Sequence, residues 1–369
     1  KAEDMRRYRQ EHKSTSLTTF RRLALDARKH SEELQTIYSQ VVQNVGDRIY
    51  RVFENFFEER AKFPRWNKPQ RYKSLTYPQS GFRLNPKKGL FLSGLGCVRI
   101  FAHRPLFGIV RRLTIKREVD GWYAIFVTEM DAPKERPLGE IPAVRIRGAD
   151  VGLEKFATFD DATSVKHPEF LRRSESKIER IQHHFNRKFK GSKRRRELGR
   201  RLARLHMHVK HQRGDFQNKL VGQIFTENDV LILEKLDVSS MLRNRKLAKS
   251  VSDASWAMFA RKAIFKAESL GKHAIFVDPW GTTQFCHRCL HWVPKDLAER
   301  EHQCPNCGET IPRDINSALL IKRLGIQSRP PSDGGSSLAE QGPLPSLREW
   351  VSPSVEAGSH RVSTGGGRH

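Results

Sequence analysis

The sequence predicts an α+β protein of several domains, in which a helical N-terminal region and a small β-barrel precede an α/β domain. Three observations predict this order. Apolar residues have helical spacing between residues 16 and 62, and segments between residues 71 and 130 are β-rich. After residue 145, short apolar strands alternate with long helical stretches. A length of 369 residues is ordinary for two or three domains.

Charge is the strongest signal in the composition. The chain has 68 Lys and Arg against 41 Asp and Glu, a formal net charge of +27. Such an excess repels itself unless a polyanion neutralises it, and nucleic acid is a polyanion bound through its phosphates. A basic surface that serves only solubility is the alternative, but solubility needs a net charge of only about 2 to 8 in a small domain. We therefore expect a nucleic-acid partner.

Membrane insertion and secretion are not expected. No apolar run approaches the roughly 18 residues that a spanning helix needs. The first 13 residues are charged throughout and do not form a signal-peptide pattern. We expect a cytoplasmic protein with no membrane partner.

The N-terminal third is expected to contain helices and then a small antiparallel sheet or barrel. Within the β-rich part, residues 110–116 and 122–128 flank Asp120-Gly121, which is a typical hairpin turn. Cys97 lies in the same part and is expected to serve packing.

Residues 171–228 predict one or two long basic helices. From Arg172 to Arg213 there are 16 Lys and Arg against 3 Glu, and an apolar stripe at helical spacing leaves the other faces basic. A charge run of this kind is commonly only a solvated helix face. The large net charge of the chain favours a nucleic-acid contact instead. The residues expected to make it are Arg187, Lys188, Lys190, Lys193, Arg194, Arg195 and Arg201.

Four of the five cysteines form two Cys-x-x-Cys pairs separated by 14 residues: Cys286, Cys289, Cys304 and Cys307. In a reducing cytosol this spacing indicates one zinc ion and not disulfides. Redox or chance pairs are the alternative, and His287, His291 or His302 could replace one cysteine. Four thiolates complete a tetrahedron, so the zinc is expected to be structural and any chemistry must lie elsewhere.

The two cysteine knuckles differ in one residue. Gly308 follows the second pair and suits a tight turn. Leu290 follows the first pair, at a place where glycine would be easier.

Three acidic residues stand at the ends of elements. Asp150 ends an apolar stretch, Glu234 ends the strand that begins at Val230, and Asp314 opens a helix. If the two strands are neighbours and the helix packs across them, the carboxylates converge. Such a cluster could hold two Mg²⁺, which activate a water and stabilise the leaving oxygen of a phosphodiester. Each acid taken alone is more commonly a cap or a solvated charge.

The segments around these acids resemble the motifs of RuvC nuclease domains, and more narrowly those of the TnpB proteins encoded by bacterial insertion sequences. The motifs occur in the order of that family, and the resemblance covers about residues 16–325. The matching segments are 148–153 with 155–158 (first motif), 230–236 (second motif), 244–247, 252–256, 304–308 (knuckle) and 313–318 (third motif), and the N-terminal segments 43–44 and 55–57.

The resemblance implies an RNase H-like (RuvC) domain with an inserted zinc ribbon, a wedge β-barrel and a helical recognition region. It further implies an RNA-guided DNA endonuclease of a transposable element, which uses a guide RNA from the transposon end. Such an enzyme cuts target double-stranded DNA beside a short adjacent motif. Asp150, Glu234 and Asp314 would be the catalytic Mg²⁺ ligands, and Gln43 matches a position near the target-adjacent DNA.

The resemblance also implies a monomeric ribonucleoprotein in the cytoplasm of a bacterium or archaeon, associated with the nucleoid. The expected parts are a helical recognition region inserted in the barrel (1–65), the wedge barrel (66–140), the RuvC-like core with long basic helices (141–277), the zinc ribbon (278–311), a final RuvC segment (312–325) and a disordered tail (326–369).

Three other functions compete with this interpretation. A catalytically silent RNA-guided DNA-binding regulator would have lost one or more of the acids, and all three are present. A guide-independent RuvC-like DNA nuclease is disfavoured by the long basic helices and the ribbon between the motifs. A zinc-ribbon RNA-binding protein without catalysis would leave the carboxylate motifs unexplained.

Overall fold

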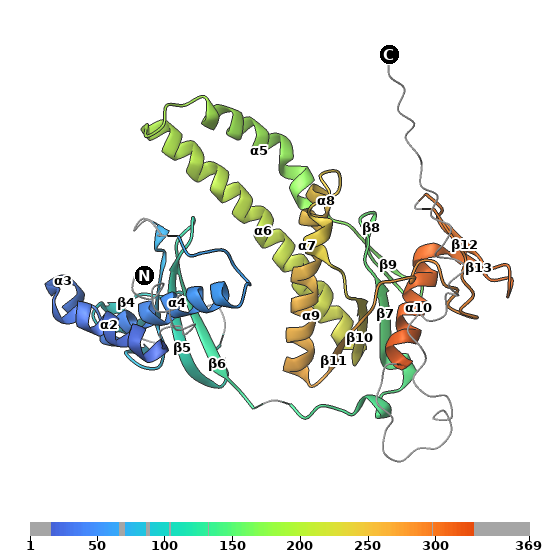
Figure 1. Ribbon diagram of the computed structural model, residues 1–369, viewed down its shortest axis with the longest axis horizontal. Coiled ribbons are helices and arrows are strands. Elements are labelled where there is room, and N and C mark those ends of the chain that lie inside the picture. The colour runs from blue at the N-terminus through green and yellow to red at the C-terminus, as the bar shows by residue number, and fades with distance from the viewer. Residues whose placement is uncertain are drawn as a thin grey trace. The chain divides into compact units, whose positions relative to one another are not determined.

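The structure is a computed structural model that describes residues 16–65, 71–85, 89–102, 105–131, 133–296 and 298–327. The expected tail at 326–369 lies outside the described residues from position 328 onward. The chain divides into two compact units, Lys1–Asp131 and Ala132–His369, which are considered separately (Figure 1).

The N-terminal unit begins with the helices that the apolar spacing predicts. They are α2 (Leu17–Lys29), α3 (Glu32–Gln35) and α4 (Ser39–Phe57). The side chain of Ser16 caps α2 by accepting a hydrogen bond from the backbone of Thr19 at 3.2 Å. Helices α2 and α4 pack closely at Gly46, where a Cβ would lie 2.7 Å from the carbonyl oxygen of Phe20.

Two three-stranded antiparallel sheets complete the N-terminal unit, and they share one apolar core. Tyr77, Leu90 and Leu113 come from the two sheets, and Val41 comes from α4. Gly121 lies in the predicted turn, between β5 and β6. The first sheet has the order β1 (Ser74–Tyr77), β5 (Ile109–Arg117), β6 (Trp122–Glu129), and the second has the order β2 (Phe82–Asn85), β3 (Gly89–Leu92), β4 (Gly96–Val98).

The C-terminal unit is built on a five-stranded mixed sheet with the order β11-β10-β7-β8-β9. Strands β7, β8 and β9 form an antiparallel meander, and β10 and β11 run parallel to β7. This topology is that of an RNase H-like domain. The strands are β7 (Ile146–Asp150), β8 (Lys155–Phe159), β9 (Ser164–Lys166), β10 (Val230–Glu234) and β11 (His273–Val277).

Helices cover both faces of this sheet, which explains why β10 reads as a continuous apolar run. Leu231 and Leu233 pack with residues of α6 and α9, whereas Val230 and Ile232 pack with Ile321 of α10 on the other face. The helices are η2 (Leu138–Glu140), η3 (Ala143–Arg145), α5 (Phe170–Asn186), α6 (Lys193–Glu227), α7 (Val238–Met241), α8 (Ala248–Ala254), α9 (Trp256–Leu270) and α10 (Arg313–Gln327).

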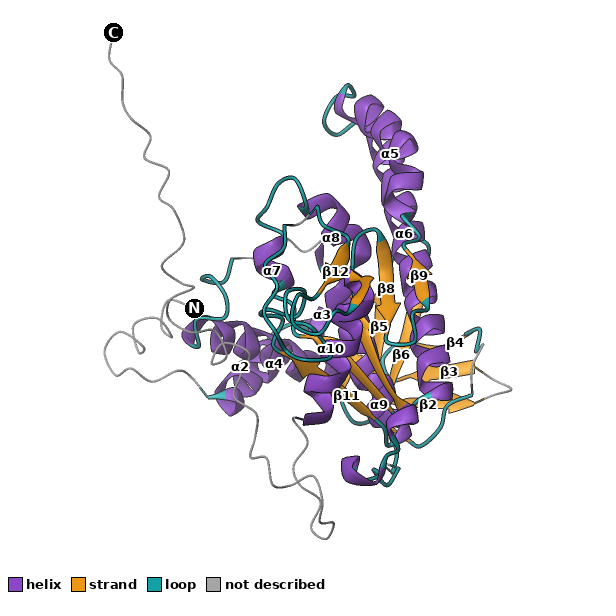
Figure 2. Cartoon of the chain, turned by 90° about the vertical axis from the view of Figure 1, so that its right-hand side faces the viewer, coloured by secondary structure: helices purple, strands orange, loops and turns teal. Residues whose placement is uncertain are grey.

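Two features project from this core. Helices α5 and α6 form the long basic pair that the sequence predicts, and Figure 2 shows its outer end standing clear of the sheet. The second is a small ribbon, β12 (Glu301–Gln303) antiparallel to β13 (Thr310–Pro312), between β11 and α10. No helix among those that the structure describes has the length and apolar character needed to cross a membrane.

Candidate active site

Three carboxylates meet at the carboxyl edge of the five-stranded sheet. Strands β7 and β10 are parallel neighbours with Ala149 paired to Leu233, and both strands end one residue later, at Asp150 and Glu234. Asp314 lies in the first turn of α10, the helix that packs on β7. The fold therefore brings together three acids that are 164 positions apart in the chain at their extremes.

The position of α10 depends on a glycine in β7. A Cβ on Gly148 would lie 2.4 Å from the backbone oxygen of Ala318 and 2.6 Å from Cβ of Lys322. Any side chain at this position would push the helix away from the strand. Gly148 thus permits the close approach that places Asp314 next to Asp150.

The acids influence one another electrostatically. Burial raises the pKa of Asp150 well above its usual value, and the charges of Glu234 and Asp314 raise it further, while Arg313 opposes them. Burial also raises the pKa of Glu234, against the hydrogen bond from Thr282. The guanidinium of Arg313 lies 3.5 Å from Asp314. Half-buried carboxylates that repel one another suit a bound cation, and their hard oxygens suit Mg²⁺.

Thr282 is a contact of this site that the sequence analysis did not find. Its side chain is only 1% exposed, and its hydroxyl donates a hydrogen bond to Oε1 of Glu234. A single threonine in a loop has no periodic pattern, and 48 positions separate it from its partner. A sequence signal for this contact is therefore lacking.

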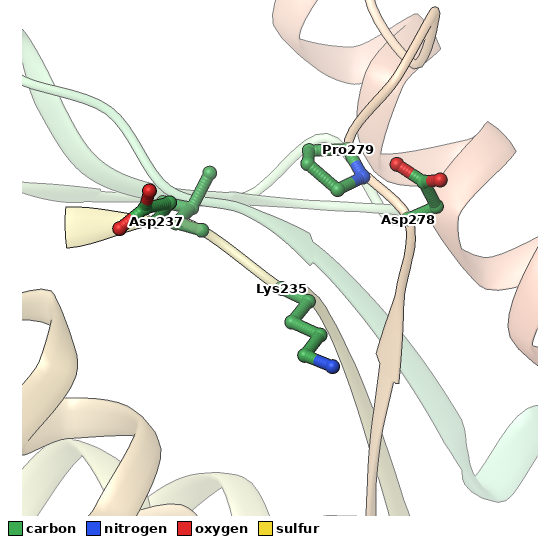
Figure 3. Close-up of a pocket in the computed structure, with 5 residues that line it drawn as sticks. Lys235, Asp237, Asp278 and Pro279 are labelled. Carbon is green, nitrogen blue, oxygen red and sulfur yellow. The ribbon is translucent and has the colours of Figure 1, made fainter. Parts of the chain in front are cut away.

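A hollow opens beside Glu234, where β10 and β11 end. Its volume is about 570 Å³, and its lining residues are Lys235, Leu236, Asp237, Asp278 and Pro279. Figure 3 shows that Asp237 and Asp278 stand on the two chain segments that leave the strands. The hollow follows the general rule that sites in open α/β sheets lie outside the carboxyl ends of parallel strands.

The four cysteines form a second site, in the ribbon. The sulfur atoms of Cys286 and Cys307 are 3.7 Å apart, and those of Cys289 and Cys304 are 3.5 Å apart. Four thiolates at about 2.3 Å from one zinc ion would have sulfur–sulfur separations of about 3.8 Å. The four sulfur atoms lie within 4.8 Å of one another, so together they could hold one metal ion. Their geometry fits a tetrahedral metal and not disulfides.

The histidines that could have replaced a cysteine make other contacts. Nδ1 of His302 contacts the amino group of Lys295, and Nδ1 of His287 lies 3.1 Å from Oδ1 of Asn316. His291 is exposed, and its backbone oxygen accepts a hydrogen bond from Cys286. The four-cysteine set is therefore the better ligand set.

The two knuckles have the same backbone turn. The amide of Leu290 donates to the carbonyl of Cys286, as the amide of Gly308 donates to that of Cys304, both at 3.0 Å. Leu290 has φ of 58° and Gly308 has φ of 73°, so both are left-handed. Leucine is strained in this conformation, but its side chain is 8% exposed and packs with Phe285 and Leu320.

Helix α10 connects the cysteine site to the carboxylates. The amide group of Asn316 donates to the carbonyl of Phe285 at 2.8 Å, and its Oδ1 accepts from the backbone of His287 at 3.0 Å. About two helical turns further along, Arg323 donates to the carbonyls of His287 and Arg288. The helix that carries Asp314 is thus bonded to the first knuckle at two levels.

Two family models match segments of the C-terminal unit. A family model described as "Probable transposase" (OrfB_IS605) matches residues 133–245, which include Asp150 and Glu234. A second model, described as "Cas12f1-like, TNB domain", matches residues 256–321, which include Asp314 and the four cysteines.

Relatives match over most of the chain. A protein of Escherichia coli (strain K12), provisionally named RNA-guided DNA endonuclease InsQ, is 28% identical over 304 residues, 78% of this chain and 74% of the relative. A protein of Streptomyces pristinaespiralis with the same provisional assignment is 28% identical over 320 residues, 84% of this chain and 78% of the relative. The TnpB-like protein L79 of Acanthamoeba polyphaga mimivirus is 26% identical over 282 residues, 71% and 51% of the two chains. The chain is similar to proteins of the TnpB family.

Among solved structures, this chain can be compared with Cas12f1 in its complex with single guide RNA and target DNA. The identity is 13% and the TM-score 0.36, over 86% of this chain and 87% of the other.

The basic residues expected to bind nucleic acid lie at the outer end of the α5–α6 pair, around the turn of residues 187–192. Arg187, Lys190, Lys193 and Arg194 are exposed. Arg195 is half-buried, because it donates to the carbonyls of Phe185 and Lys188, both at 2.8 Å, and its guanidinium lies 4.0 Å from the Phe185 ring. Arg201 pairs with Glu197 at 2.7 Å, and Lys188 is half-buried. Gln43 lies half-buried on α4 of the N-terminal unit.

Proposed function

We propose that this protein is an RNA-guided DNA endonuclease of a transposable element. Its catalytic site, which hydrolyses target DNA, would consist of Asp150, Glu234 and Asp314. The observation that carries the proposal is the convergence of these carboxylates from β7, β10 and α10 within the segments that match the family models. The names of the E. coli and Streptomyces relatives support the same activity.

The three carboxylates would hold two Mg²⁺ ions. When bound, these ions supply an activated water and stabilise the leaving oxygen of the phosphodiester. The protein's own part is to hold the acids in place through the β7–β10 register and through the packing of α10 on Gly148. The hollow beside Glu234 gives the DNA strand room to approach this edge, where Lys235 offers a positive charge to a phosphate.

Zinc would fill the four-cysteine site and stabilise the ribbon without taking part in hydrolysis. The exposed cations at the end of the α5–α6 pair would contact phosphates of the guide RNA or of its duplex with target DNA. In the N-terminal unit, α2–α4 would form the recognition region, with Gln43 near the target-adjacent DNA, and the two small sheets would form the wedge. We propose a monomeric ribonucleoprotein that acts on cellular DNA.

The test begins with the RNA that copurifies with the full chain. Sequencing this RNA gives the constant scaffold and the guide, and a reprogrammed guide is then used on plasmids with a randomised sequence beside the target. We expect Mg²⁺-dependent cleavage only when guide and target match. Cleavage without RNA would support a guide-independent nuclease, and RNA-dependent binding without cleavage would support a silent regulator.

Replacing Asp150 tests the site itself. Asp150→Ala should slow cleavage by at least about 1,000-fold, the equivalent of about 4 kcal/mol of transition-state stabilisation, with RNA and DNA binding unchanged. Glu154→Gln is the matched control, because Glu154 is an exposed acid four residues further along, paired with Arg300 at 3.2 Å. Cleavage by Asp150→Ala at the rate of the control would show that the catalytic site lies elsewhere.

A further inference from the structure

Thr282 links the ribbon to the sheet edge. It lies in the loop between β11 and the first cysteine knuckle, four residues before Cys286. Its hydroxyl is within hydrogen-bonding distance of two acceptors, Oε1 of Glu234 and the carbonyl of Pro279, the latter at 2.9 Å. A hydroxyl carries one hydrogen. A charged carboxylate is the stronger acceptor, so the hydrogen belongs to Glu234 whenever that group is ionised.

The loop holds Thr282 in place from both sides. Gly281 has φ of 76°, and a Cβ there would lie 2.7 Å from the Phe285 ring. Phe285 is 1% exposed and packs with Leu290 of the first knuckle and Leu320 of α10. The packing of Phe285 therefore fixes the backbone that carries Thr282, and with it the position of the hydroxyl.

The loop and knuckle of the ribbon consequently make hydrogen bonds that hold two of the three acids in place. The ribbon reaches Asp314 through Asn316 of α10, and it reaches Glu234 directly through Thr282. Carboxylates that bind metals are commonly oriented by such hydrogen bonds from residues that do not themselves touch the metal.

We infer that Thr282 is a positioning residue for the metal centre: its hydroxyl fixes the orientation of the Glu234 carboxylate and so raises the affinity of the sheet edge for divalent cations. The inference rests on the proposed function, because it takes Glu234 to be a metal ligand. Thr282 itself contacts neither metal nor DNA in this role. A purely structural threonine would instead serve only to satisfy a buried hydroxyl.

Four variants of the full chain with its RNA separate the hydroxyl from the size of the side chain. Thr282→Val keeps the shape and removes the hydroxyl, whereas Thr282→Ser keeps the hydroxyl and loses a methyl group. Thr282→Ala and Thr282→Ser share that loss and differ only in the hydroxyl. Thr283→Val is the matched control, since Thr283 is exposed and uses its backbone oxygen to bind Lys295 at 3.0 Å.

The primary measurement is Mn²⁺ binding by calorimetry and electron paramagnetic resonance, accompanied by zinc content and the unfolding temperature. We expect Thr282→Val to bind Mn²⁺ about 10- to 100-fold more weakly than the wild type, with zinc content unchanged. Half-maximal cleavage should need correspondingly more Mg²⁺. Thr282→Ser and Thr283→Val should match the wild type, and Thr282→Ala should bind more weakly than Thr282→Ser.

Two results would overturn the inference: equal Mn²⁺ affinity in Thr282→Val and the wild type, or equal affinity in Thr282→Ala and Thr282→Ser. The Ala–Ser comparison decides even if Thr282→Val loses zinc or stability. Failure of the proposed function is distinguishable, because Mn²⁺ binding that depends on Thr282 without any DNA cleavage would reject the nuclease activity alone. A wild-type protein that binds Mn²⁺ no better than Asp150→Ala would reject the metal site and the inference together.

Discussion

At the residue scale, Leu290 shows how packing offsets backbone strain. The first knuckle needs a left-handed residue after its second cysteine, and Gly308 supplies it without strain in the second knuckle. Leu290 accepts the same conformation because its side chain is buried with Phe285 and Leu320. The position thus joins the knuckle to the helix that carries Asp314, which a glycine could not do.

The balance at Leu290 leads to a prediction about two variants. Leu290→Gly loses the buried side chain, a cost of about 2–3 kcal/mol, but removes roughly 1 kcal/mol of strain. Leu290→Ala loses nearly as much packing and keeps the strain. We expect both variants to release zinc to a chelator faster than the wild type, with alanine faster than glycine. Zinc release that is slower in Leu290→Ala than in Leu290→Gly would contradict a strained left-handed leucine.

The sequence predicts some residues of the site and not others, for a physical reason. Asp150 and Glu234 end apolar strands, and a strand end is visible from periodicity alone. Thr282 and Asn316 act through single hydrogen bonds to distant positions, which leave no periodic trace. The sequence gives one weak signal for Asn316. Asparagine is unfavourable inside a helix, so its presence there indicates that its side chain has a hydrogen-bond partner.

At the scale of elements, the α5–α6 pair shows that a run of basic residues contains different roles. Its exposed cations resemble one another in the sequence, yet Arg195 points into the turn and holds the carbonyls of Phe185 and Lys188. Spacing and charge could predict the helices and the basic surface. They could not predict which arginine closes the turn, because that depends on how the chain reverses at residues 187–192.

Arg195 should therefore contribute more to the stability of the turn at residues 187–192 than to the electrostatic attraction of RNA. Arg195→Lys keeps the charge but loses the paired hydrogen bonds and the stacking on Phe185, about 1–2 kcal/mol of local stability. We expect amide hydrogen exchange in residues 187–192 to accelerate about tenfold, with RNA affinity nearly unchanged.

Arg194→Lys is the matched control, since Arg194 is exposed at the preceding position of the same helix. It should exchange like the wild type. A phosphate contact would look different: Arg195→Ala would lower the salt dependence of RNA binding by about one counterion. Such a loss, without faster exchange in the turn, would show that Arg195 faces the nucleic acid.

At the scale of the whole molecule, the ribbon connects the four-cysteine site to the three carboxylates that we propose as metal ligands. The ribbon has only two three-residue strands, so a bound metal would contribute to its folding free energy. Its folded form places Asn316 against the first knuckle and Thr282 against Glu234. Zinc would thereby influence hydrolysis although it touches no carboxylate.

Removing zinc from the assembled protein–RNA complex should disable cleavage. With the knuckles unfolded, α10 loses its bonds to His287 and Arg288, and Asp314 loses its fixed place opposite Asp150. We expect a zinc-selective chelator to reduce the cleavage rate at least about 100-fold, the equivalent of about 3 kcal/mol. Excess Mg²⁺ should not restore the rate, whereas added Zn²⁺ should.

RNA binding, measured in parallel, should persist, because the exposed cations of the α5–α6 pair lie on helices outside the ribbon. Full cleavage by a complex that is free of zinc would show that the carboxylates hold their places without the ribbon.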